Sequence, residues 1–496
     1  MKHLYTFERR FLAGAIILHI IAAWLSSGFH HPDEHQQIIE FASYRLGHAP
    51  AHILPWEFAA KMRPGLQPFL TYLLLRTYYA TGAVNPYYFL FLLRLISAML
   101  SLWTAVRFHM AVRLSIQSIP MRKLHFVLSV FGWGLVYLHV RYSSENWSAL
   151  CFTAAVIALL DKGPYRFWWF GLFAGLSFAF RFQSGFFIAG AGLWMLFADR
   201  TRIKDILMAT IGFLLVFGCG VLADRWLYGS WTLSCWAYLD QNIFQHKAAQ
   251  FGLEPWYWYC LQILQLCIPP FSLLILSGLA AMVIYRPRHV LTWSVLLFLI
   301  AHSVVGHKEF RFLFPCAFFI PYIVITALEY RQQRFPRWDQ KKGFRVFSRI
   351  FATAFWLTNA VALTLMICKP ASDAVALNQY LYNHINKPTL LIYSTPQSPM
   401  LSDHKKADFY EHRLIKTYCI DEVMQDTAFL RGKQVLLYSE HAFKKDEFIF
   451  QFAPHFFDSS RTSLYYANLP QWLYYFNINN WIERSNCYSL YLLDTR

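Results

Sequence analysis

Two acidic residues, Asp33 and Glu34, stand in HHPDEHQQ, residues 30–37, where either could act as a general base. Proline is common at the first position of a helix, so a helix beginning at Pro32 places both acids in its first turn. The helix dipole favours their ionised forms, and inverting sugar transfer is one reaction that needs such a base. Successive helix positions point about 100° apart, and Asp33 shares a face with Gln37, so we favour Asp33. The alternative is that both acids only stabilise a helix start.

A second cluster, HKEFRF at residues 307–312, lies between two apolar stretches. Charged residues at the edge of a lipid-embedded helix are costly and are usually functional or paired. His307, Lys308 and Arg311 could hold a phosphate, since arginine offers a planar fork of donors and lysine a point charge. A phosphate leaving group needs such neutralisation in the transition state. Glu309 could orient a basic neighbour. The alternative is that these side chains anchor a helix at the interface.

Aromatic and amide side chains dominate a third cluster, which runs from Asp224 to Tyr259. Such side chains suit recognition of a sugar or a polyprenyl chain, although the same composition is typical of an aromatic belt at a membrane interface. From this cluster we take Asn242, Trp256 and Tyr259 as candidate substrate-binding residues.

Further candidates share one property, a position in a short polar segment beside an apolar stretch. They are Trp56, Glu57 and Arg63 in PWEFAAKMRPGLQP, and Arg141 and Arg181 in RYSSEN and RFQSG. The first three are candidates for substrate binding, and either of the last two arginines could contact a phosphate. The alternative for those two is an arginine that snorkels to the interface. The chain contains no GxGxxG, Walker, HExxH, DxD or CxxC motif, and we predict no metal and no separate cofactor.

Membrane helices must position these residues. The 496-residue chain is 56% apolar and 15% charged, against about 25% charged residues in soluble proteins, and its mean hydropathy is +0.31. Long apolar stretches recur from Phe11 to about Cys368, too many for one water-soluble core. The net charge of +17 is spread over short clusters between these stretches. That pattern argues against nucleic-acid binding and is typical of cytoplasmic loops.

We expect about eleven transmembrane helices. They are placed at 11–27, 87–108, 124–140, 147–161, 167–180, 185–198, 206–222, 258–283, 290–305, 312–328 and 348–367. Several are close to or below the lower limit of about 17 residues for crossing the lipid. The 167–180 span is the least secure, and leaving it out would reverse the sidedness of everything after it.

The basic clusters predict the topology. With the N-terminus in the cytoplasm, every dense cluster of Lys and Arg falls in a cytoplasmic loop. The opposite face then receives the first outer loop, 28–86, together with RYSSEN, the 223–257 segment, the HKEFR turn and the polar tail. All the candidate site residues therefore collect on the non-cytoplasmic side.

The start of the first outer loop predicts an amphipathic helix. One face carries Ile38, Ile39, Phe41, Ala42 and Leu46, and the opposite face carries Asp33, Gln36, Gln37 and Glu40. A helix with this pattern is expected to lie on the membrane surface.

The chain changes character after about residue 368. Residues 1–368 form the predicted membrane domain, and the polar, mixed sequence of 369–496 predicts a non-cytoplasmic α/β domain. Cys419 and Cys487 lie in this tail and could form a disulfide in an oxidising compartment.

Taken in order, these motifs resemble those of the Alg9-like mannosyltransferases. HPDE is similar to the family's HPDE or PDE motif, PWE…RP to its tryptophan–glutamate–arginine stretch, and HKEFRF to its HKExRF signature. The 224–259 segment is similar to the family's sequence before its middle spans. HPDE alone is a weak signal, but HKExRF at this separation makes the resemblance specific. His35, the RYSSENWS turn and the tail depart from the family pattern.

The resemblance implies an all-α polytopic membrane protein of GT-C type. It also implies inverting transfer of mannose from a polyprenyl-phosphate donor to a lipid-linked or anchor glycan, with an acid equivalent to Asp33 as catalyst. The expected partners are membrane lipid, this donor and a glycan or glycolipid acceptor, and we expect a monomer. Alternatives are a GT-C transferase for a pentose or glucose, or a flippase for a lipid-linked glycan. We see neither the inverted repeats nor the broken midplane helices of many transporters.

The sequence leaves two membranes as alternatives for the location of the protein. Asn146-Trp147-Ser148 is the single N-glycosylation sequon, and it adjoins a predicted span. This scarcity slightly favours a bacterial inner membrane over the endoplasmic reticulum, with the site on the periplasmic or lumenal side.

Overall fold

The computed structural model describes residues 5–161, 163–268 and 271–393 without interruption. Beyond them it describes the shorter stretches 401–402, 405–406, 408–410, 412–425, 430, 433–439, 462–468 and 488–493. The chain divides into two compact units. One comprises Met1–Gly47 and Leu54–Lys369, and the other comprises His48–Ile53 and Pro370–Arg496.

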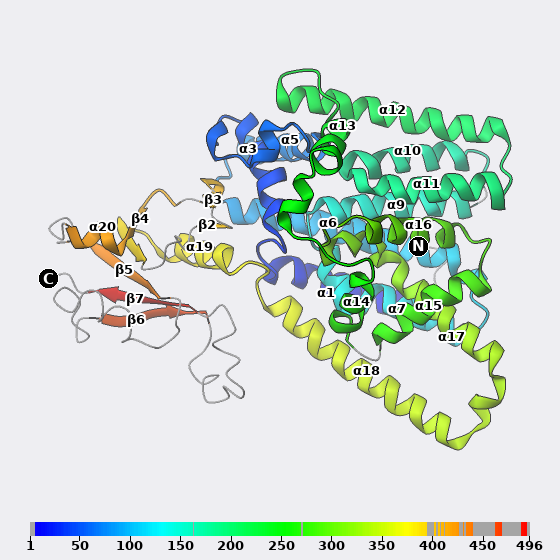
Figure 1. The fold of residues 1–496 in the computed structure, drawn as a ribbon. Coiled ribbons are helices and arrows are strands. Elements are labelled where there is room, and N and C mark those ends of the chain that lie inside the picture. Colours follow the sequence, from blue (N-terminus) through cyan, green and yellow to red (C-terminus); the bar gives the residue numbers. More distant parts are fainter. Residues whose placement is uncertain are drawn as a thin grey trace. The chain divides into compact units, whose positions relative to one another are not determined.

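The first unit is a helical bundle (Figure 1). Its helices are α1 (Thr6–Leu25), α2 (Pro32–Glu34), α3 (Glu40–Arg45), α4 (Trp56–Ala59), α5 (Leu66–Ala80), α6 (Pro86–Val112), α7 (Ile119–Phe131), α8 (Trp133–His139), α9 (Ser144–Leu160), α10 (Arg166–Phe180), α11 (Gly185–Leu193), α12 (Ile203–Tyr228), α13 (Ser234–Leu239), α14 (Trp258–Leu266), α15 (Phe271–Tyr285), α16 (Val290–Val304), α17 (Ile320–Arg334) and α18 (Lys342–Cys368). Phe310–Phe319 is a 3-10 helix that leads into α17, and π-helical turns occur at His35–Ile39, Trp194–Ala198 and Asp240–Phe244.

Each predicted span falls on one or two of these helical segments. Within the described residues, four segments are long and apolar enough to cross a membrane: Pro86–Ser115, Ile203–Tyr228, Phe310–Arg334 and Lys342–Cys368. A fifth is possible if α8 and α9, bent by 102° relative to each other, form one broken span. The chain is therefore a helical membrane protein, and the count of eleven stays a prediction.

The least secure span, 167–180, coincides with α10. Glycines bring this helix unusually close to α12. A Cβ atom on Gly171 would lie 2.0 Å from the carbonyl oxygen of Ala209, and one on Gly175 would lie 2.8 Å from Cβ of Val216. Small residues allow membrane helices to pack backbone against backbone where the hydrophobic effect does not drive association. Close packing against α12 thus secures a helix that is short for a span.

Large apolar side chains fill the middle of the bundle. The rings of Phe152, Phe187 and Phe298, from α9, α11 and α16, stack at centroid distances of 4.8 and 3.8 Å. They belong to one buried cluster that also takes in residues of α6, α10 and α17. One apolar core therefore packs together helices from the first, middle and last parts of this unit.

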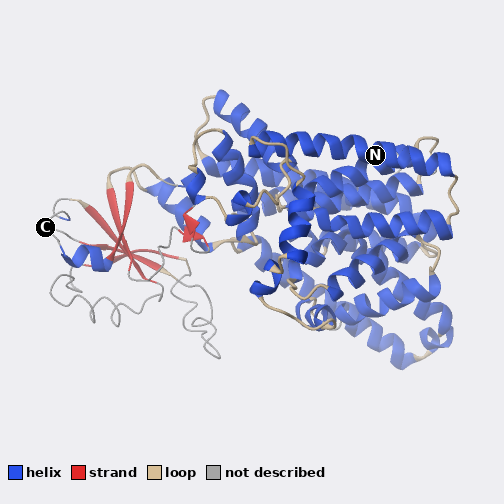
Figure 2. Cartoon of the chain, turned by 45° about the horizontal axis from the view of Figure 1, so that its top comes forward, coloured by secondary structure: helices blue, strands red, loops and turns tan. Residues whose placement is uncertain are grey.

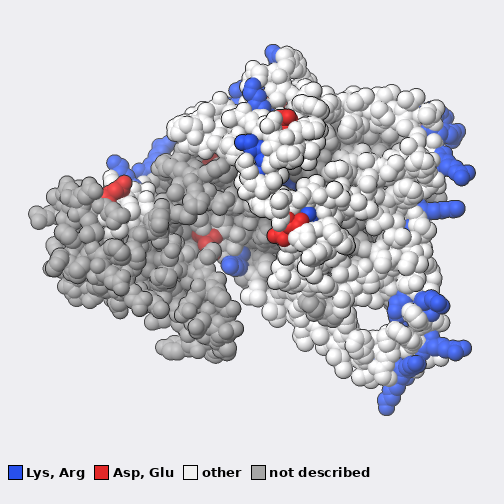
Figure 3. All heavy atoms as spheres, viewed as in Figure 1, with Lys and Arg blue, Asp and Glu red and all other residues white. Residues whose placement is uncertain are grey.

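Basic residues gather at one end of the bundle. There Arg286 donates to Glu329 at 2.6 Å and to the carbonyl of Ser115 at 3.0 Å, and Glu329 accepts from the backbone of Gln117 at 2.7 Å. Figure 3 shows lysine and arginine side chains along this end, where α17 leads into α18. Three of the predicted cytoplasmic segments, at 115–117, 286 and 329, thus meet at the C-terminal end of α17.

The predicted surface helix differs from its expectation. The helix continues from Pro32 to Arg45 through the π-helical turn, but residues on both of its faces are buried in protein. Gln36 and Glu40 are 4% and 0% exposed, and Glu40 lies 2.8 Å from Nε2 of His35. The prediction of a helix on the membrane surface was wrong for these residues. On the polar face, which was expected to contact water, Glu40 and His35 satisfy each other as a buried polar pair.

The second unit contains strands as well as helices (Figure 2). Its elements are α19 (Asp373–His384), α20 (Ile420–Gln425), β1 (Thr389–Tyr393), β2 (Leu401–Ser402), β3 (Lys405–Lys406), β4 (Ile415–Cys419), β5 (Gln434–Ser439), β6 (Thr462–Ala467) and β7 (Ser489–Leu493). The strand order is β4-β1-β5-β7-β6, with β4, β1 and β5 parallel and β7 antiparallel to both β5 and β6. A separate pair joins β2 to β3.

Both faces of this sheet are covered. Leu390 and Ile392 pack with Ile420 and Val423 of α20, whereas Leu391, between them in β1, packs on the other face with the apolar side of α19. A central parallel strand buried on both faces requires such a continuous apolar run. Cys487, one half of the disulfide considered above, lies outside the described residues.

Candidate active site

Asp33 forms the centre of the site. Pro32 starts α2, and the backbone amide of Asp33 donates to Nδ1 of His31 at 3.2 Å, which caps the helix start. Nη2 of Arg311 donates to Oδ2 of Asp33 at 2.9 Å, across 278 residues of sequence. Nη2 of Arg63 lies 4.0 Å from the same oxygen. The structure therefore joins the HPDE, PWE…RP and HKEFRF motifs at one carboxylate.

Two arginines set the ionisation of Asp33. Burial by itself would raise its pKa, but the positive charges of Arg311 and then Arg63 outweigh burial and hold the pKa below its usual range. The carboxyl group is thus ionised at neutral pH.

Glu34 points elsewhere, as the helical spacing predicts. Its Oε1 accepts from the backbone amide of His30 at 3.2 Å. Burial raises the pKa of Glu34 to about 8, against the opposing charge of Arg141. Two adjacent acids therefore differ in character, one ionised beside arginines and one that holds a proton at neutral pH.

Arg311 is surrounded by carboxylates. Besides Asp33, its guanidinium contacts Glu309 and lies 3.5 Å from Oε1 of Glu145. Glu309 also accepts from His307 at 3.1 Å. Burial would raise the pKa of Glu309, but hydrogen bonds from His307 and Arg311 outweigh burial and hold it well below its usual range. Arg311 is therefore held in an ion-pair network and does not snorkel to the interface.

Lys308 is not brought to this network. Its side chain is turned to backbone carbonyls, and Nζ donates to those of Glu254, Val305 and Gly306 at 2.8, 2.5 and 3.4 Å. The residue is 5% exposed. An ammonium group has three donors, so these contacts use all of them. The structure gives Lys308 a role in holding the turn after α16, in place of the expected phosphate contact.

Arg181 reaches the network through a carboxylate that sequence reasoning missed. Glu145, at the start of α9, accepts from Arg181 at 2.7 Å and is 4% exposed. Glu145 stands in RYSSEN, and a lone acid at the start of an apolar helix was the only available signal. Arg141, from the same turn, is 1% exposed and donates to the carbonyls of Ser26 and Gly28 at 2.8 and 3.1 Å. Arg141 therefore fastens the end of α1, and the snorkelling alternative was wrong for it.

The third sequence cluster, from Asp224 to Tyr259, holds the main chain at Arg63 in place. The hydroxyl of Tyr228 donates to the carbonyl of Arg63 at 2.7 Å and accepts from its amide at 3.2 Å. Asp224 accepts from the backbone of Gly65 at 2.7 Å. Arg63 also lies 3.5 Å from Glu57. The 224–234 segment thus positions the arginine through its main chain, and sequence spacing alone could not show that pairing.

Four other predicted residues lie outside the ion-pair network. Trp56 is 37% exposed and has the ammonium of Lys247 over its ring at 5.4 Å. Asn242 donates to the carbonyl of Tyr238 in its own helical segment at 2.9 Å. Trp256 is 73% exposed, whereas Tyr259 is 3% exposed in α14. None of these four has a recorded contact with Asp33 or Arg311 in the described part of the chain.

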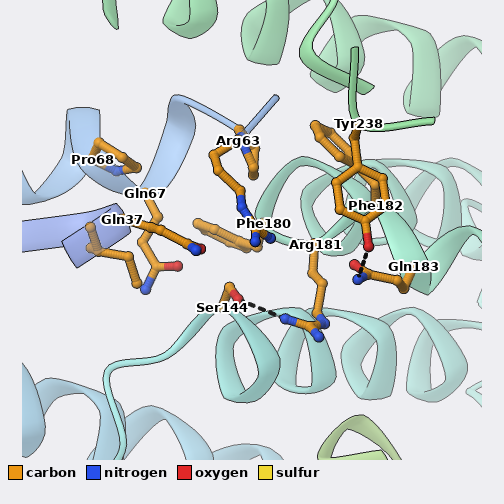
Figure 4. A pocket seen from close by; sticks show the side chains of 12 residues that line it. Gln37, Arg63, Gln67, Pro68, Ser144, Phe180, Arg181, Phe182, Gln183 and Tyr238 are labelled. Atoms are coloured by element: carbon orange, nitrogen blue, oxygen red, sulfur yellow. Dashed lines mark hydrogen bonds between the residues drawn. The ribbon is translucent and has the colours of Figure 1, made fainter. Parts of the chain in front are cut away.

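A hollow opens beside the ion-pair network (Figure 4). The hollow and the open solvent at its mouth together amount to about 420 Å³. Arg63 and Arg181 line it, with Gln37, Gln67, Ser144 and Tyr238 among the polar neighbours. In Figure 4 the amide of Gln37 and the guanidinium of Arg63 point toward one another across the hollow. Arg63 thus connects the hollow to Asp33, and Arg181 connects it to Glu145.

An apolar groove adjoins the hollow. The groove and the open solvent at its mouth amount to about 300 Å³, and Pro64 and Phe182 line both the groove and the hollow. Its walls come from α10, α12 and the loop before α13, and include Phe178, Phe217 and Leu233. Together the two cavities offer a charged, polar compartment next to an apolar one.

Among the described residues, no group of three or more His, Cys, Asp or Glu side chains is arranged to hold a metal ion. The absence of a metal and a cofactor from the reaction stays a prediction.

The fold is that of a helical membrane protein whose structural neighbours have the GT-C fold. The structure of ArnT from Cupriavidus metallidurans bound to undecaprenyl phosphate is similar, with a TM-score of 0.50 and 10% identity, over 98% of this chain and 97% of that one. At this identity the likeness shows the fold alone.

Sequence comparisons give the family. The model of the Alg9-like mannosyltransferase family matches residues 11–390, and the chain belongs to this family. Mannosyltransferase APTG1 of Arabidopsis thaliana is 25% identical over 332 residues, 62% of this chain and 56% of that protein. GPI alpha-1,2-mannosyltransferase 3 of Xenopus laevis is 22% identical over 429 residues, 78% of each chain. The matched region thus spans little more than half of the first relative and over three quarters of the second.

Proposed function

We propose that this chain is an inverting glycosyltransferase that moves mannose from a polyprenyl-phosphate donor to a lipid-linked or anchor glycan. The reaction takes place on the non-cytoplasmic face of the membrane. The observation that carries the proposal is the 2.9 Å contact between Asp33 and Arg311, which joins the two motifs that most resemble the family signature.

Three groups of the network have a direct place in this reaction. Asp33 takes the proton of the acceptor hydroxyl as its oxygen attacks the anomeric carbon. The bond between that carbon and the phosphate oxygen breaks, and the electron pair leaves with the polyprenyl phosphate. Arg311 and Arg63 neutralise the growing charge on the phosphate. A phosphate that draws Arg311 away from Asp33 also makes the carboxylate more basic, because a positive neighbour is lost.

The adjoining cavities support a lipid-linked donor. The apolar groove at Phe178, Phe217 and Leu233 offers a surface for the polyprenyl chain, and it shares Pro64 with the polar hollow, where Arg63 and Arg181 are available for the phosphate. A nucleotide-sugar donor would have no use for an apolar groove at this place.

The sidedness is proposed from the distribution of charge. The basic end of the bundle is taken as cytoplasmic by the positive-inside rule, and α17 separates Glu329 at that end from Arg311 before its start. The site then faces the periplasm or the lumen. A bacterial inner membrane remains slightly favoured by the scarcity of sequons, and the endoplasmic reticulum is the alternative.

Transfer of a pentose or glucose is the second candidate, because the same fold and the same carboxylate could serve another sugar. Membership of a mannosyltransferase family favours mannose.

The test is a membrane assay with radiolabelled polyprenyl-phosphate mannose. We expect Asp33→Asn to lower the rate of transfer by a factor of about 10²–10⁴, the usual contribution of a general base, while the variant stays folded and inserted. Glu34→Gln is the matched control and should retain most of the activity, because Glu34 accepts from the backbone of His30 and its raised pKa keeps it protonated at neutral pH. Full activity in Asp33→Asn would remove this residue from the mechanism.

A further inference from the structure

The polar hollow contains side-chain atoms whose hydrogen-bonding capacity is unused. Within the described part of the chain, neither Nε2 nor Oε1 of Gln67 has a hydrogen-bond partner, and the same holds for Nε2 of Gln37 and for Nε of Arg63 and Arg181. All four residues line the hollow. Gln67 is 2% exposed. The unused groups therefore come from four separate segments of the chain and line one hollow.

Unpaired buried polar groups are destabilising and uncommon in native proteins, so a concentration of them calls for a physical reason. A ligand that hydrogen-bonds to all of them is one such reason. The amide of Gln67 can accept from one hydroxyl through Oε1 and donate to the next through Nε2. Adjacent hydroxyls on a ring fit this pattern, and the nearby rings of Tyr238 and Phe182 offer apolar surface to the ring's C–H face.

We propose that the hollow is a subsite for a pyranose ring, in which Gln67 and Gln37 bind ring hydroxyls and so determine sugar specificity. This inference rests on the proposed function and names the residues that recognise the sugar. The ring belongs either to the donor or to the terminal unit of the acceptor glycan, since both present the same hydroxyl chemistry.

The position of the hollow puts such a ring next to the reacting groups. Arg63 lines the hollow and lies 4.0 Å from Asp33. Arg181 lines it from the other side and joins Glu145, which in turn lies 3.5 Å from Arg311. A ring held by Gln37 and Gln67 is therefore flanked by the arginines proposed to bind the phosphate.

The test replaces each amide by an apolar side chain of similar size. For Gln67→Leu and Gln37→Leu we expect kcat/KM to fall by about tenfold for each hydrogen-bonded amide. A rise of KM for polyprenyl-phosphate mannose alone assigns the ring to the donor, and a rise of KM for the acceptor alone assigns it to the acceptor. Gln265→Leu, an exposed position on α14, is the matched control.

Thermal stability separates binding from a structural role. Removing an unpaired buried amide should leave the Tm of the ligand-free protein unchanged or higher. A Gln67→Leu variant with a lower Tm and unchanged KM values would overturn the proposal, because it would show that the amide supports the fold. Unchanged kinetics for both substrates in the double variant Gln37→Leu/Gln67→Leu would overturn it as well.

A direct binding experiment keeps this inference distinct from the proposed function. Methyl α-mannopyranoside should raise the Tm of the wild-type protein, and the rise should be lost in Gln67→Leu. A wild-type protein that binds the glycoside but transfers nothing from polyprenyl-phosphate mannose would contradict the proposed donor and leave the subsite intact. Equal shifts, or no shift, in both proteins would contradict the subsite.

Discussion

At the scale of single residues, neighbours in sequence have different environments in the structure. Asp33 lies between arginines and is ionised, while Glu34 beside it is held protonated at neutral pH by burial. Arg311 joins the network at Asp33, but Lys308, three residues earlier in the chain, is bound to backbone carbonyls. The charge of a side chain therefore does not determine its role. Its role depends on the direction in which the backbone orients the side chain.

The acid limb of the pH profile should report on Arg311. Its guanidinium holds the pKa of Asp33 below about 3.9, the ordinary pKa of aspartate. In the wild-type protein Asp33 should therefore stay ionised, and kcat/KM should not fall, until the pH is below about 3.9. In Arg311→Gln the pKa of Asp33 should rise, and activity should be lost at a higher pH as the base takes up a proton. The pH dependence of kcat/KM measures this shift.

Arg337→Gln provides the control for that profile, because Arg337 is exposed and lies beyond the end of α17. An acid limb at the same pH in Arg311→Gln and in the wild-type protein would show that Asp33 is not the titrating base.

Lys308 should matter for stability and little for the donor. In Lys308→Met three backbone carbonyls lose their donor, at a cost of about 1–3 kcal/mol. We expect a lower Tm with an unchanged KM for polyprenyl-phosphate mannose in the active fraction. Lys204→Met, an exposed position in α12, is the control. A raised donor KM without loss of stability would restore the phosphate-binding role.

At the scale of elements, the site depends on short segments that hold one another. The loop carrying Arg63 is fixed by Tyr228 and by the contact of Asp224 with Gly65. A Cβ atom on Gly65 would lie 2.6 Å from the carbonyl oxygen of Ala223. The C-terminal end of α12 therefore determines the conformation of the loop. The packing of α12 against α10 in turn holds α12 in position.

Close packing of α10 and α12 leads to a stability prediction. Gly171→Ala places a methyl group against the carbonyl of Ala209, and overpacking of this kind costs about 1–3 kcal/mol. We expect a lower Tm for Gly171→Ala. Gly218→Ala in α12 is the matched control, because a Cβ atom there meets nothing within 4 Å. Equal Tm values for the two variants would mean that the helices pack less closely than described.

At the scale of the whole molecule, the helical unit separates two kinds of loop. Arg286, from one of the loops with clustered Lys and Arg, pairs with Glu329 at one end of α17, and the loops with the motif residues converge on Asp33 at the start of the 3-10 helix before α17. The proposed sidedness of the reaction rests on this segregation, and it can be tested without any substrate.

Thiol labelling should distinguish the two ends. Gln250→Cys lies in the exposed turn before α14, and Gln340→Cys lies in the exposed turn before α18. In sealed membranes with the native orientation, we expect a membrane-impermeant reagent added outside the cytoplasmic compartment to label Gln250→Cys alone. Gln340→Cys should react only after permeabilisation. The wild-type chain measures the background of its own cysteines, and labelling of both positions from the same side would contradict the topology.

The amino-acid sequence alone determined the class of the molecule and the positions of its helices. Apolar stretches bounded by basic clusters place helices by local composition, and Pro32 with the acids that follow it marks a helix start by local chemistry. HPDE and HKEFRF could also be singled out, because charge beside lipid is costly without a purpose.

Only the tertiary structure decided which of these residues meet. Asp33 and Arg311 are 278 residues apart, and no local pattern specifies a pair at that separation. Glu145 and Gln67 carry no sequence signal beyond being polar near an apolar stretch, yet one completes the ion-pair network and the other faces the hollow. Local propensity fixes helices residue by residue, whereas the packing of helices against one another fixes which side chains share a buried space.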